Sequence, residues 1–205
     1  MFSDELKKHR LIPVVVIDDA QDAAPLADAI VSGGLGCVEI TLRTSVALEA
    51  IKTMAKRTDI VVGAGTVLNI EQAKAAVDNG SRFIVSPGMS VSLVEWCLKN
   101  NVPVFPGCAT PTEIQLALEA GLRTVKFFPA EQLGGVKMLT TLGSVFQTVQ
   151  FMPTGGITSE NLEDYLAIKQ VVACGGSWMV QSQWIRNRRF SIIHDEIQRV
   201  VKLLH

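Results

Sequence analysis

The feature that most constrains the fold of this chain is a regular alternation of short apolar runs with longer amphipathic stretches. Several of the apolar runs are nearly continuous, as expected of parallel strands that are covered on both faces. The stretches between them have the apolar periodicity of surface helices. The strand-like runs begin at Leu11, Cys37, Ile60, Arg82, Val102, Thr124, Val149 and Val171.

Repeated strand–helix units predict an α/β fold, and the number of units favours a single-domain (β/α)8, or TIM, barrel over residues 1–205. An open doubly wound sheet is the alternative, but no G-x-G-x-x-G loop follows the first strand. We expect an extra N-terminal helix over residues 2–10 and the last outer helix over residues 190–204. Further helices are expected over residues 22–32, 45–57, 70–79, 91–100, 111–120 and 159–167.

Composition is that of an ordinary globular protein, with 48% hydrophobic residues and a formal net charge of -1. This charge gives no electrostatic reason to expect nucleic acid or an anionic membrane as a partner. No apolar run approaches the roughly 18 residues that a membrane span needs. Residues 1–8 are charged and contain no apolar signal core. We therefore expect a cytoplasmic protein with no nucleic-acid or membrane partner.

Cysteine and histidine are too scattered to form a familiar metal or redox motif. All three histidines fall in the terminal segments, which excludes a histidine triad or a His-rich metal site in the central region. A Mg²⁺ ion held by carboxylates remains open at this point. The arginines at 186, 188 and 189 are expected to be a solvated surface. The cysteines have no CxxC spacing and are expected to be buried free thiols; they are Cys37, Cys97, Cys108 and Cys174.

One lysine lies where a charged side chain is not expected. Lys126 stands inside the apolar run of residues 124–129. Burying an ammonium group is costly unless it is paired or loses its proton. A desolvated lysine holds its proton weakly, and the neutral amine can attack a carbonyl carbon. The alternatives are a lysine that reaches solvent from a strand end and one that sits in a buried ion pair.

The second strand presents polar residues on one face. Glu39, Thr41 and Arg43 are spaced at i, i+2 and i+4, and this spacing places them on the same side of a strand. Phe128 likewise shares a face with Lys126. In a (β/α)8 barrel the active site lies at the carboxyl ends of the strands, so an inward-pointing Lys126 would meet Glu39 there. Glu39 as a structural ion-pair partner and Arg43 as a surface residue remain alternatives.

Two further strand exits offer candidate site residues. Thr66 follows the small residues of the third strand, which would leave room beside it. It could also cap the next helix, and both roles are compatible. Pro87 ends the fourth strand, where its ring could wall a cavity or simply form a turn.

Gly-Gly pairs follow the last two strands. Gly155 and Gly156 come directly after Thr154, and a second pair that ends at Gly176 precedes Ser177. With a helix N-terminus behind them, such exits expose several backbone N–H groups and form an anion-binding concavity. Phosphate sites are common at these strands of (β/α)8 enzymes, so we predict a phosphate site, with plain turn geometry as the alternative.

Taken together, these segments resemble the 2-keto-3-deoxy-6-phosphogluconate (KDPG) aldolase family, also called the KHG/KDPG aldolase family. The resemblance extends over nearly the whole chain. The segment PGCAT at 106–110 is similar to the fifth-strand exit of the family. The other segments are VEITLR at 38–43, VGAGTV at 62–67, SPG at 86–88, VKFFPAE at 125–131, PTGGI at 153–157 and GGSW at 175–178.

The resemblance implies a class I aldolase that needs no metal and no cofactor, and it implies a homotrimer. Its substrate would be the phosphorylated keto acid KDPG, cleaved reversibly to pyruvate and glyceraldehyde 3-phosphate. Lys126 would form the Schiff base, and Glu39 would move the protons. The implied substrate-binding residues are Arg43 and Thr66 at the carboxylate, Pro87 and Phe128 in the apolar wall, and Thr154, Gly155, Gly156, Gly176 and Ser177, of which the last four hold the phosphate.

Other functions remain open on the sequence alone. The galactonate epimer of the substrate is one alternative, and cleavage of 4-hydroxy-2-oxoglutarate to pyruvate and glyoxylate is another. A non-catalytic barrel that binds a phosphorylated ligand would need neither Lys126 nor Glu39. A metal-dependent lyase or epimerase would usually need histidines or several carboxylates at the strand ends, and treatment with a chelator would discriminate it.

Overall fold

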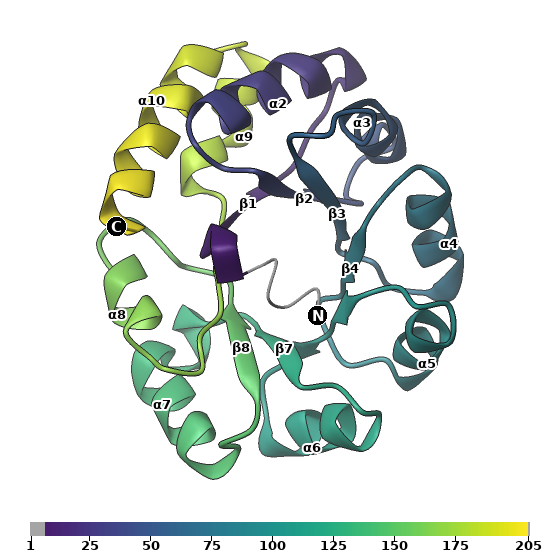
Figure 1. The fold of residues 1–205 in the computed structure, drawn as a ribbon, viewed down its shortest axis with the longest axis vertical. Coiled ribbons are helices and arrows are strands. Elements are labelled where there is room, and N and C mark those ends of the chain that lie inside the picture. The colour runs from purple at the N-terminus through teal and green to yellow at the C-terminus, as the bar shows by residue number, and fades with distance from the viewer. Residues whose placement is uncertain (1–6, 205) are drawn as a thin grey trace.

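The computed structural model describes residues 7–204. Its strands curl around a common centre, and the helices lie on the outside (Figure 1). Every strand ladder is parallel. The strands are β1 (Leu11–Val15), β2 (Cys37–Thr41), β3 (Val61–Gly65), β4 (Phe83–Val85), β5 (Val104–Phe105), β6 (Gly107–Cys108), β7 (Thr124–Phe127), β8 (Gln150–Pro153) and β9 (Cys174–Gly176).

The strands form a six-stranded sheet in the order β5-β4-β3-β2-β1-β9 and a three-stranded sheet in the order β6-β7-β8. The fifth predicted strand is thus divided at Pro106, which has no N–H to donate. The Pro106 carbonyl still accepts a hydrogen bond of 2.9 Å from the Lys126 N–H. At the other junction, an isolated parallel bridge joins Thr154 to Gly175. The two sheets are therefore in contact at both of their junctions.

The helices begin and end close to the predicted positions. Gly80 and Gly121 follow α4 and α6 with φ of +96° and +92°, as predicted for left-handed residues after helix ends. The helices are α2 (Ala23–Ser32), α3 (Ala47–Met54), α4 (Ile70–Asp78), α5 (Val91–Lys99), α6 (Pro111–Glu119), α7 (Gly135–Val145), α8 (Leu162–Leu166), α9 (Ser182–Arg186) and α10 (Phe190–Val201), with short 3-10 helices that include η2 (Glu131–Leu133) and η3 (Trp178–Val180).

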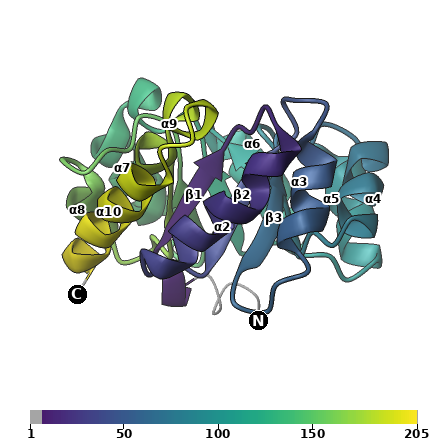
Figure 2. The same cartoon turned by 90° about the horizontal axis from the view of Figure 1, so that it is seen from above.

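Two segments differ from the sequence prediction. Residues 2–6 of the expected N-terminal helix lie outside the described part of the chain, and residues 7–9 are helical. The helix α7 had no counterpart among the predicted helices. Seen from the side, α9 lies at the end of the sheet toward which β1 runs (Figure 2). The carboxyl ends of the strands and α9 therefore share one end of the molecule.

The core has two parts. A large cluster of buried apolar side chains lies between the strands and the helices. A smaller cluster is drawn almost wholly from strands and includes Ile12, Phe83, Phe105 and Met152. Ile12 belongs to this cluster whereas its neighbour Leu11 belongs to the large one, as expected because successive strand residues face opposite sides. The four cysteines are free and buried, which confirms that prediction.

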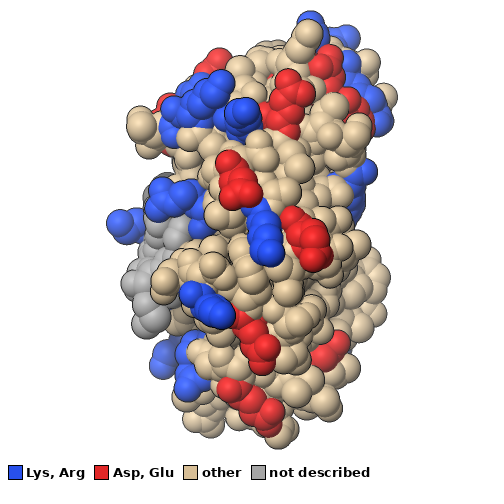
Figure 3. Space-filling view, turned by 90° about the vertical axis from the view of Figure 1, so that its right-hand side faces the viewer, with Lys and Arg blue, Asp and Glu red and all other residues tan. Residues whose placement is uncertain are grey.

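Charged side chains on the outside are mixed in sign. On the face that carries α4, basic and acidic residues alternate with uncharged surface (Figure 3). Two of the predicted surface arginines pair with aspartates: Arg186 lies 3.2 Å from Asp18, and Arg188 lies 3.0 Å from the buried Asp22. In the described part of the chain, no helix combines the length and apolar character that a membrane crossing requires.

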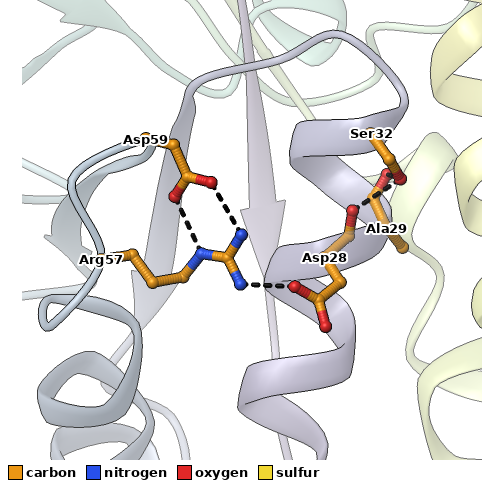
Figure 4. Close-up of polar contacts among 5 residues, drawn as sticks. All are labelled: Asp28, Ala29, Ser32, Arg57 and Asp59. Atoms are coloured by element: carbon orange, nitrogen blue, oxygen red, sulfur yellow. Dashed lines mark hydrogen bonds and ion pairs between the residues drawn. The ribbon is translucent and has the colours of Figure 1, made fainter.

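A second ion cluster joins α2 to the segment after α3 (Figure 4). The Arg57 guanidinium donates to both carboxylate oxygens of Asp59, at 2.9 and 2.8 Å, and also to Asp28. The hydrogen bond from Arg57 holds the pKa of the Asp59 carboxyl below its usual value. These side chains are 29–68% exposed, so water and salt screen the interaction.

Candidate active site

The centre of the candidate site is a buried pair of opposite charges. The Lys126 Nζ atom lies 3.7 Å from Glu39 Oε1, and the two side chains are 7% and 2% exposed. The ammonium also lies 4.8 Å from the centre of the Phe128 ring. The expected meeting of β2 and β7 side chains inside the curled sheet is therefore found. A lysine in this position is shielded from water and has a proton acceptor close by.

Neighbouring glycine makes room for the carboxylate. In the β2–β3 ladder Thr41 is paired with Gly65, and the Glu39 side chain lies over that glycine. A Cβ atom at Gly65 would lie 2.0 Å from Glu39 Oε1. Thr41 itself donates its hydroxyl to the Val15 carbonyl at 2.8 Å, so it braces β2 against β1. The small residue predicted to leave space here thus makes room for Glu39.

Arg43 and Thr66 meet just beyond the ends of β2 and β3. The Arg43 Nε atom donates to Thr66 Oγ1 at 3.4 Å. Arg43 is exposed, and Thr66 has a left-handed φ of +56°. Positive φ is unfavourable for a β-branched residue, and such strain is often concentrated at functional sites. Thr66 does not cap the next helix, because the Asn69 side chain accepts from the Gln72 N–H and takes that role.

A cavity of about 460 Å³ opens at the strand ends. Arg43 and Phe128 line it, and these residues connect it to Thr66 and Lys126 respectively. Lys126 and Glu39 do not themselves line the cavity, which leaves them behind the Phe128 ring. The candidate residues that line this cavity are Arg43, Phe128, Thr154, Gly155, Gly156, Gly176 and Ser177.

Pro87 lies apart from this cavity, and the structure gives it a different contact. A Cβ atom at Gly107 would lie 2.1 Å from the Pro87 carbonyl oxygen, so the two strand exits approach closely. Pro87 is absent from the cavity lining in the described structure. Its observed role is to pack the β4 exit against β6.

The glycine exits are turns, and no helix N-terminus stands directly behind them. The helix α8 begins at Leu162, several residues after Gly156, and Ser177 is followed only by the short 3-10 helix η3. The expectation of a helix N-terminus there is therefore wrong. Gly155 and Gly156 have φ of +97° and +78°. The Ser177 side chain is exposed and makes no capping hydrogen bond, so its hydroxyl can face a ligand.

The structure adds residues that the sequence did not single out. Trp178 lines the cavity, and its ring occupies the space that a Cβ at Gly176 would need. The Tyr165 hydroxyl donates to the Glu131 carboxylate beside the Gly156 turn. Neither contact has a signal in the sequence, because each joins residues through tertiary packing. Among the described residues, no three His, Cys, Asp or Glu side chains gather into a group that could hold a metal ion.

The arrangement defines a class of site: a shielded lysine with a carboxylate at 3.7 Å, next to a cavity with flexible glycine exits. It is typical of enzymes that bind a carbonyl compound covalently through lysine. The glycine exits resemble those that hold anionic groups.

Comparison with known proteins identifies the family. The family model described as KDPG and KHG aldolase matches residues 2–197. A 2-dehydro-3-deoxy-phosphogluconate aldolase from Treponema pallidum (strain Nichols) is 46% identical over 202 residues, which cover 98% of this chain and 96% of the relative. The enzyme of the same name from Haemophilus influenzae is 44% identical over 97% of this chain and 92% of the relative.

A solved structure agrees with the sequence comparison. The KDPG aldolase from Legionella pneumophila, crystallised with pyruvate as a covalent carbinolamine intermediate, superimposes with a TM-score of 0.94. It is 39% identical to this chain, and the match covers 98% of each chain. The chain therefore belongs to the KDPG and KHG aldolase family.

Proposed function

We propose that this chain is a class I aldolase that cleaves KDPG to pyruvate and glyceraldehyde 3-phosphate through a Schiff base on Lys126. The observation that carries the proposal is the shielded pair of Lys126 and Glu39, 3.7 Å apart. The curated relatives are named as lyases of this substrate, which supports the same reaction here.

The chemistry follows from the lysine. The neutral amine attacks the keto carbon, and loss of water from the carbinolamine leaves an iminium ion. The iminium accepts the electron pair of the carbon–carbon bond that breaks, so the pyruvate half becomes an enamine. Protonation of the enamine and hydrolysis of the iminium then release pyruvate and regenerate Lys126.

Glu39 is suited to move the protons. Carbinolamine formation, loss of water and cleavage each require a proton to be added or removed next to the reacting carbons. The carboxylate stands 3.7 Å from Nζ and is 2% exposed, so water competes little for these transfers. Its charge also offsets the positive charge of the iminium.

The remaining residues orient the two ends of the substrate. Arg43 can bind the planar carboxylate of the pyruvate half in a bidentate manner, with the Thr66 hydroxyl beside it. Phe128 covers the reacting centre, and Pro87 supports the neighbouring strand exit. The phosphate occupies the cavity formed by Gly155, Gly156, Thr154, Gly176 and Ser177. Binding at this distance helps to align the keto carbon with Lys126.

Reduction with borohydride tests the proposal directly. Pyruvate followed by borohydride should inactivate the protein and add one reduced pyruvyl group to Lys126, located by peptide mass spectrometry. The adduct should not form in Lys126→Ala. Modification at a different lysine would overturn the assignment. Full activity in the presence of a chelator is expected, because the iminium replaces a metal as electron sink.

A second activity is favoured by the family description, which names KHG beside KDPG. We propose slower cleavage of 4-hydroxy-2-oxoglutarate to pyruvate and glyoxylate, since the pyruvate half of both substrates is the same. The galactonate epimer is not favoured, because the curated relatives are named for the gluconate compound. Rates on the three substrates, measured by release of pyruvate, rank these activities.

Three structural proposals accompany this function. We propose that the curled sheet is a complete (β/α)8 barrel with an N-terminal helix, supported by the contacts at both sheet junctions. We also propose that the chain is one domain, and that it works as a homotrimer in the cytoplasm, as the family resemblance implies. Light scattering during gel filtration should give three times the chain mass of 22.2 kDa if the trimer exists.

A further inference from the structure

The segment after β7 is fastened to the turn after β8. The Ala130 N–H donates to the Thr154 carbonyl at 2.8 Å, and the Glu131 N–H donates to the Gly155 carbonyl at 3.1 Å. The residues that follow Lys126 in the chain therefore hold the start of the glycine turn. Movement of this turn relative to Lys126 would break these hydrogen bonds.

The Glu131 side chain passes between two glycines. A Cβ atom at Gly156 would lie 2.6 Å from the Cβ and Cγ atoms of Glu131, and a Cβ at Gly135 would lie 2.9 Å from its Oε1. Both glycines have left-handed φ values, +78° and +58°, which side chains rarely adopt. The path of Glu131 along the Gly156 turn thus depends on the absence of side chains at both positions.

The carboxylate of Glu131 ends at a buried hydroxyl. Tyr165, on α8, is 0% exposed and donates its hydroxyl to Glu131 Oε1. Burial, followed by the hydrogen bond to Glu131, raises the pKa of Tyr165, so its hydroxyl remains a donor at neutral pH. Without the carboxylate, this buried hydroxyl would lose its partner at a cost in free energy.

The same turn is held from its other side. The Asn161 amide donates to the Gly156 carbonyl at 3.1 Å, and its Oδ1 accepts from the Thr158 N–H at 2.9 Å. Glu131 and Tyr165 do not line the cavity of the described structure, whereas Gly155 and Gly156 do. The pair can therefore act on a bound anion only through the position of the turn.

We propose that Glu131 and Tyr165 are positioning residues that fix the Gly155-Gly156 turn, and with it the substrate phosphate, at a set distance from Lys126. This inference rests on the proposed function, because it assigns the phosphate to that turn. It predicts that the pair affects recognition of the phosphorylated half of the substrate and leaves the chemistry of the pyruvate half unchanged.

Tyr165→Phe tests the proposal because it removes the hydroxyl and keeps the ring. The condensation of pyruvate should be measured with glyceraldehyde 3-phosphate and with glyceraldehyde, which differ only in the phosphate. The KM for the phosphorylated aldehyde should rise by about 5–20-fold, the effect of one or two lost hydrogen bonds. The KM for glyceraldehyde, and kcat for both, should stay within about twofold of wild type.

Further variants separate positioning from a general loss of stability. Glu131→Gln keeps an acceptor for Tyr165 and should retain the wild-type KM, whereas Glu131→Ala should match Tyr165→Phe. The double variant Glu131→Ala/Tyr165→Phe should show no additional loss, because one contact is removed twice. Thr141→Val is the matched control: it removes a hydroxyl that donates to the Lys137 carbonyl on the exposed side of α7.

The outcomes distinguish this inference from the proposed function. Equal losses on both aldehydes, or no change on either, would overturn the positioning role. Borohydride trapping of pyruvate on each variant reads the Lys126 chemistry separately. A wild-type protein that forms no adduct would overturn the proposed function itself. If circular dichroism shows that Tyr165→Phe is unfolded, the contrast between Glu131→Gln and Glu131→Ala decides the question.

Discussion

The buried pair of Lys126 and Glu39 and the surface cluster around Arg57 are both ion pairs, but they are built differently. At the surface, Arg57 makes two hydrogen bonds of 2.9 and 2.8 Å to Asp59 in a bidentate fork. In the interior, Lys126 and Glu39 are 3.7 Å apart, which is longer than a hydrogen bond. The better geometry is therefore found where water weakens the interaction most.

This difference indicates what each pair is for. A buried pair must repay the loss of hydration with close hydrogen bonds, and one without them is weak evidence for stability. The gap between Lys126 and Glu39 leaves the amine accessible to a carbonyl carbon and the carboxylate accessible to protons. The Arg57 fork has no cavity beside it in the described structure and joins two outer elements. Function explains the interior pair, and local order explains the surface pair.

Removing the interior cation should have the largest effect. Lys126→Ala leaves no amine to form the Schiff base, so turnover should fall to the rate without protein. The measurement is pyruvate release from KDPG, with circular dichroism to verify folding. Lys137→Ala, which alters an exposed lysine on α7, is the control and should keep full activity. An active Lys126→Ala protein would show that the buried pair has only a structural role.

The interior anion should have the next largest effect. Glu39→Gln preserves size and hydrogen bonding but cannot carry a proton, so kcat should fall by about 10²–10⁴-fold. Borohydride trapping should still detect some pyruvate on Lys126, because the amine is present. A kcat within about threefold of wild type would mean that another group transfers the protons.

The gap between the two charges can be altered without changing either of them. In Gly65→Ala the new methyl group would stand 2.0 Å from Glu39 Oε1, so the carboxylate must move. Misplacement of a reacting group by an ångström can cost about 10²-fold in rate, and we expect a loss of that size in kcat. Gly88→Ala is the matched control, because nothing lies within 4 Å of a Cβ there. Equal activities of the two variants would indicate that Glu39 tolerates displacement.

A smaller effect is expected at the phosphate cavity, where no charge of the buried pair is touched. Ser177→Ala removes one hydroxyl donor and should reduce kcat/KM for KDPG by about 1–3 kcal/mol, the usual size for a hydrogen bond to a charged group. Cleavage of 4-hydroxy-2-oxoglutarate, which carries no phosphate, should be nearly unchanged. Comparable losses on both substrates would place Ser177 in support of the catalytic pair instead.

Much of the fold could be predicted from the sequence because buried parallel strands have a clear apolar signature. The runs predicted at Leu11, Cys37 and Thr124 begin at the first residues of β1, β2 and β7. The helix α7 was not anticipated, since Gly143 and two threonines weaken its helical signal. The division of the fifth strand at Pro106 follows from a missing N–H, although the apolar run conceals it.

The candidate site was predictable where a residue conflicts with its surroundings. Lys126 and Glu39 stand out because charged side chains are rare inside apolar strands. The cap at Asn69 was misassigned to Thr66, because both residues are able to cap and only the backbone decides between them. The contact between Glu131 and Tyr165 joins residues 34 positions apart, so local patterns carry no trace of it. Its detection required the packed structure.

The smallest effect should come from the surface fork. Arg57→Ala removes its contacts with Asp59 and Asp28, but exposed ion pairs contribute little to stability, and the melting temperature should fall by at most about 2–4 °C. Activity should be unchanged. Because the fork lowers the pKa of Asp59 in the folded protein, its contribution is present above the ordinary carboxyl pKa and is lost as the pH falls through the lowered value. The melting curves of wild type and variant should therefore converge in acid and in high salt. A larger shift, or a loss of turnover, would mean that this outer cluster supports the interior pair after all.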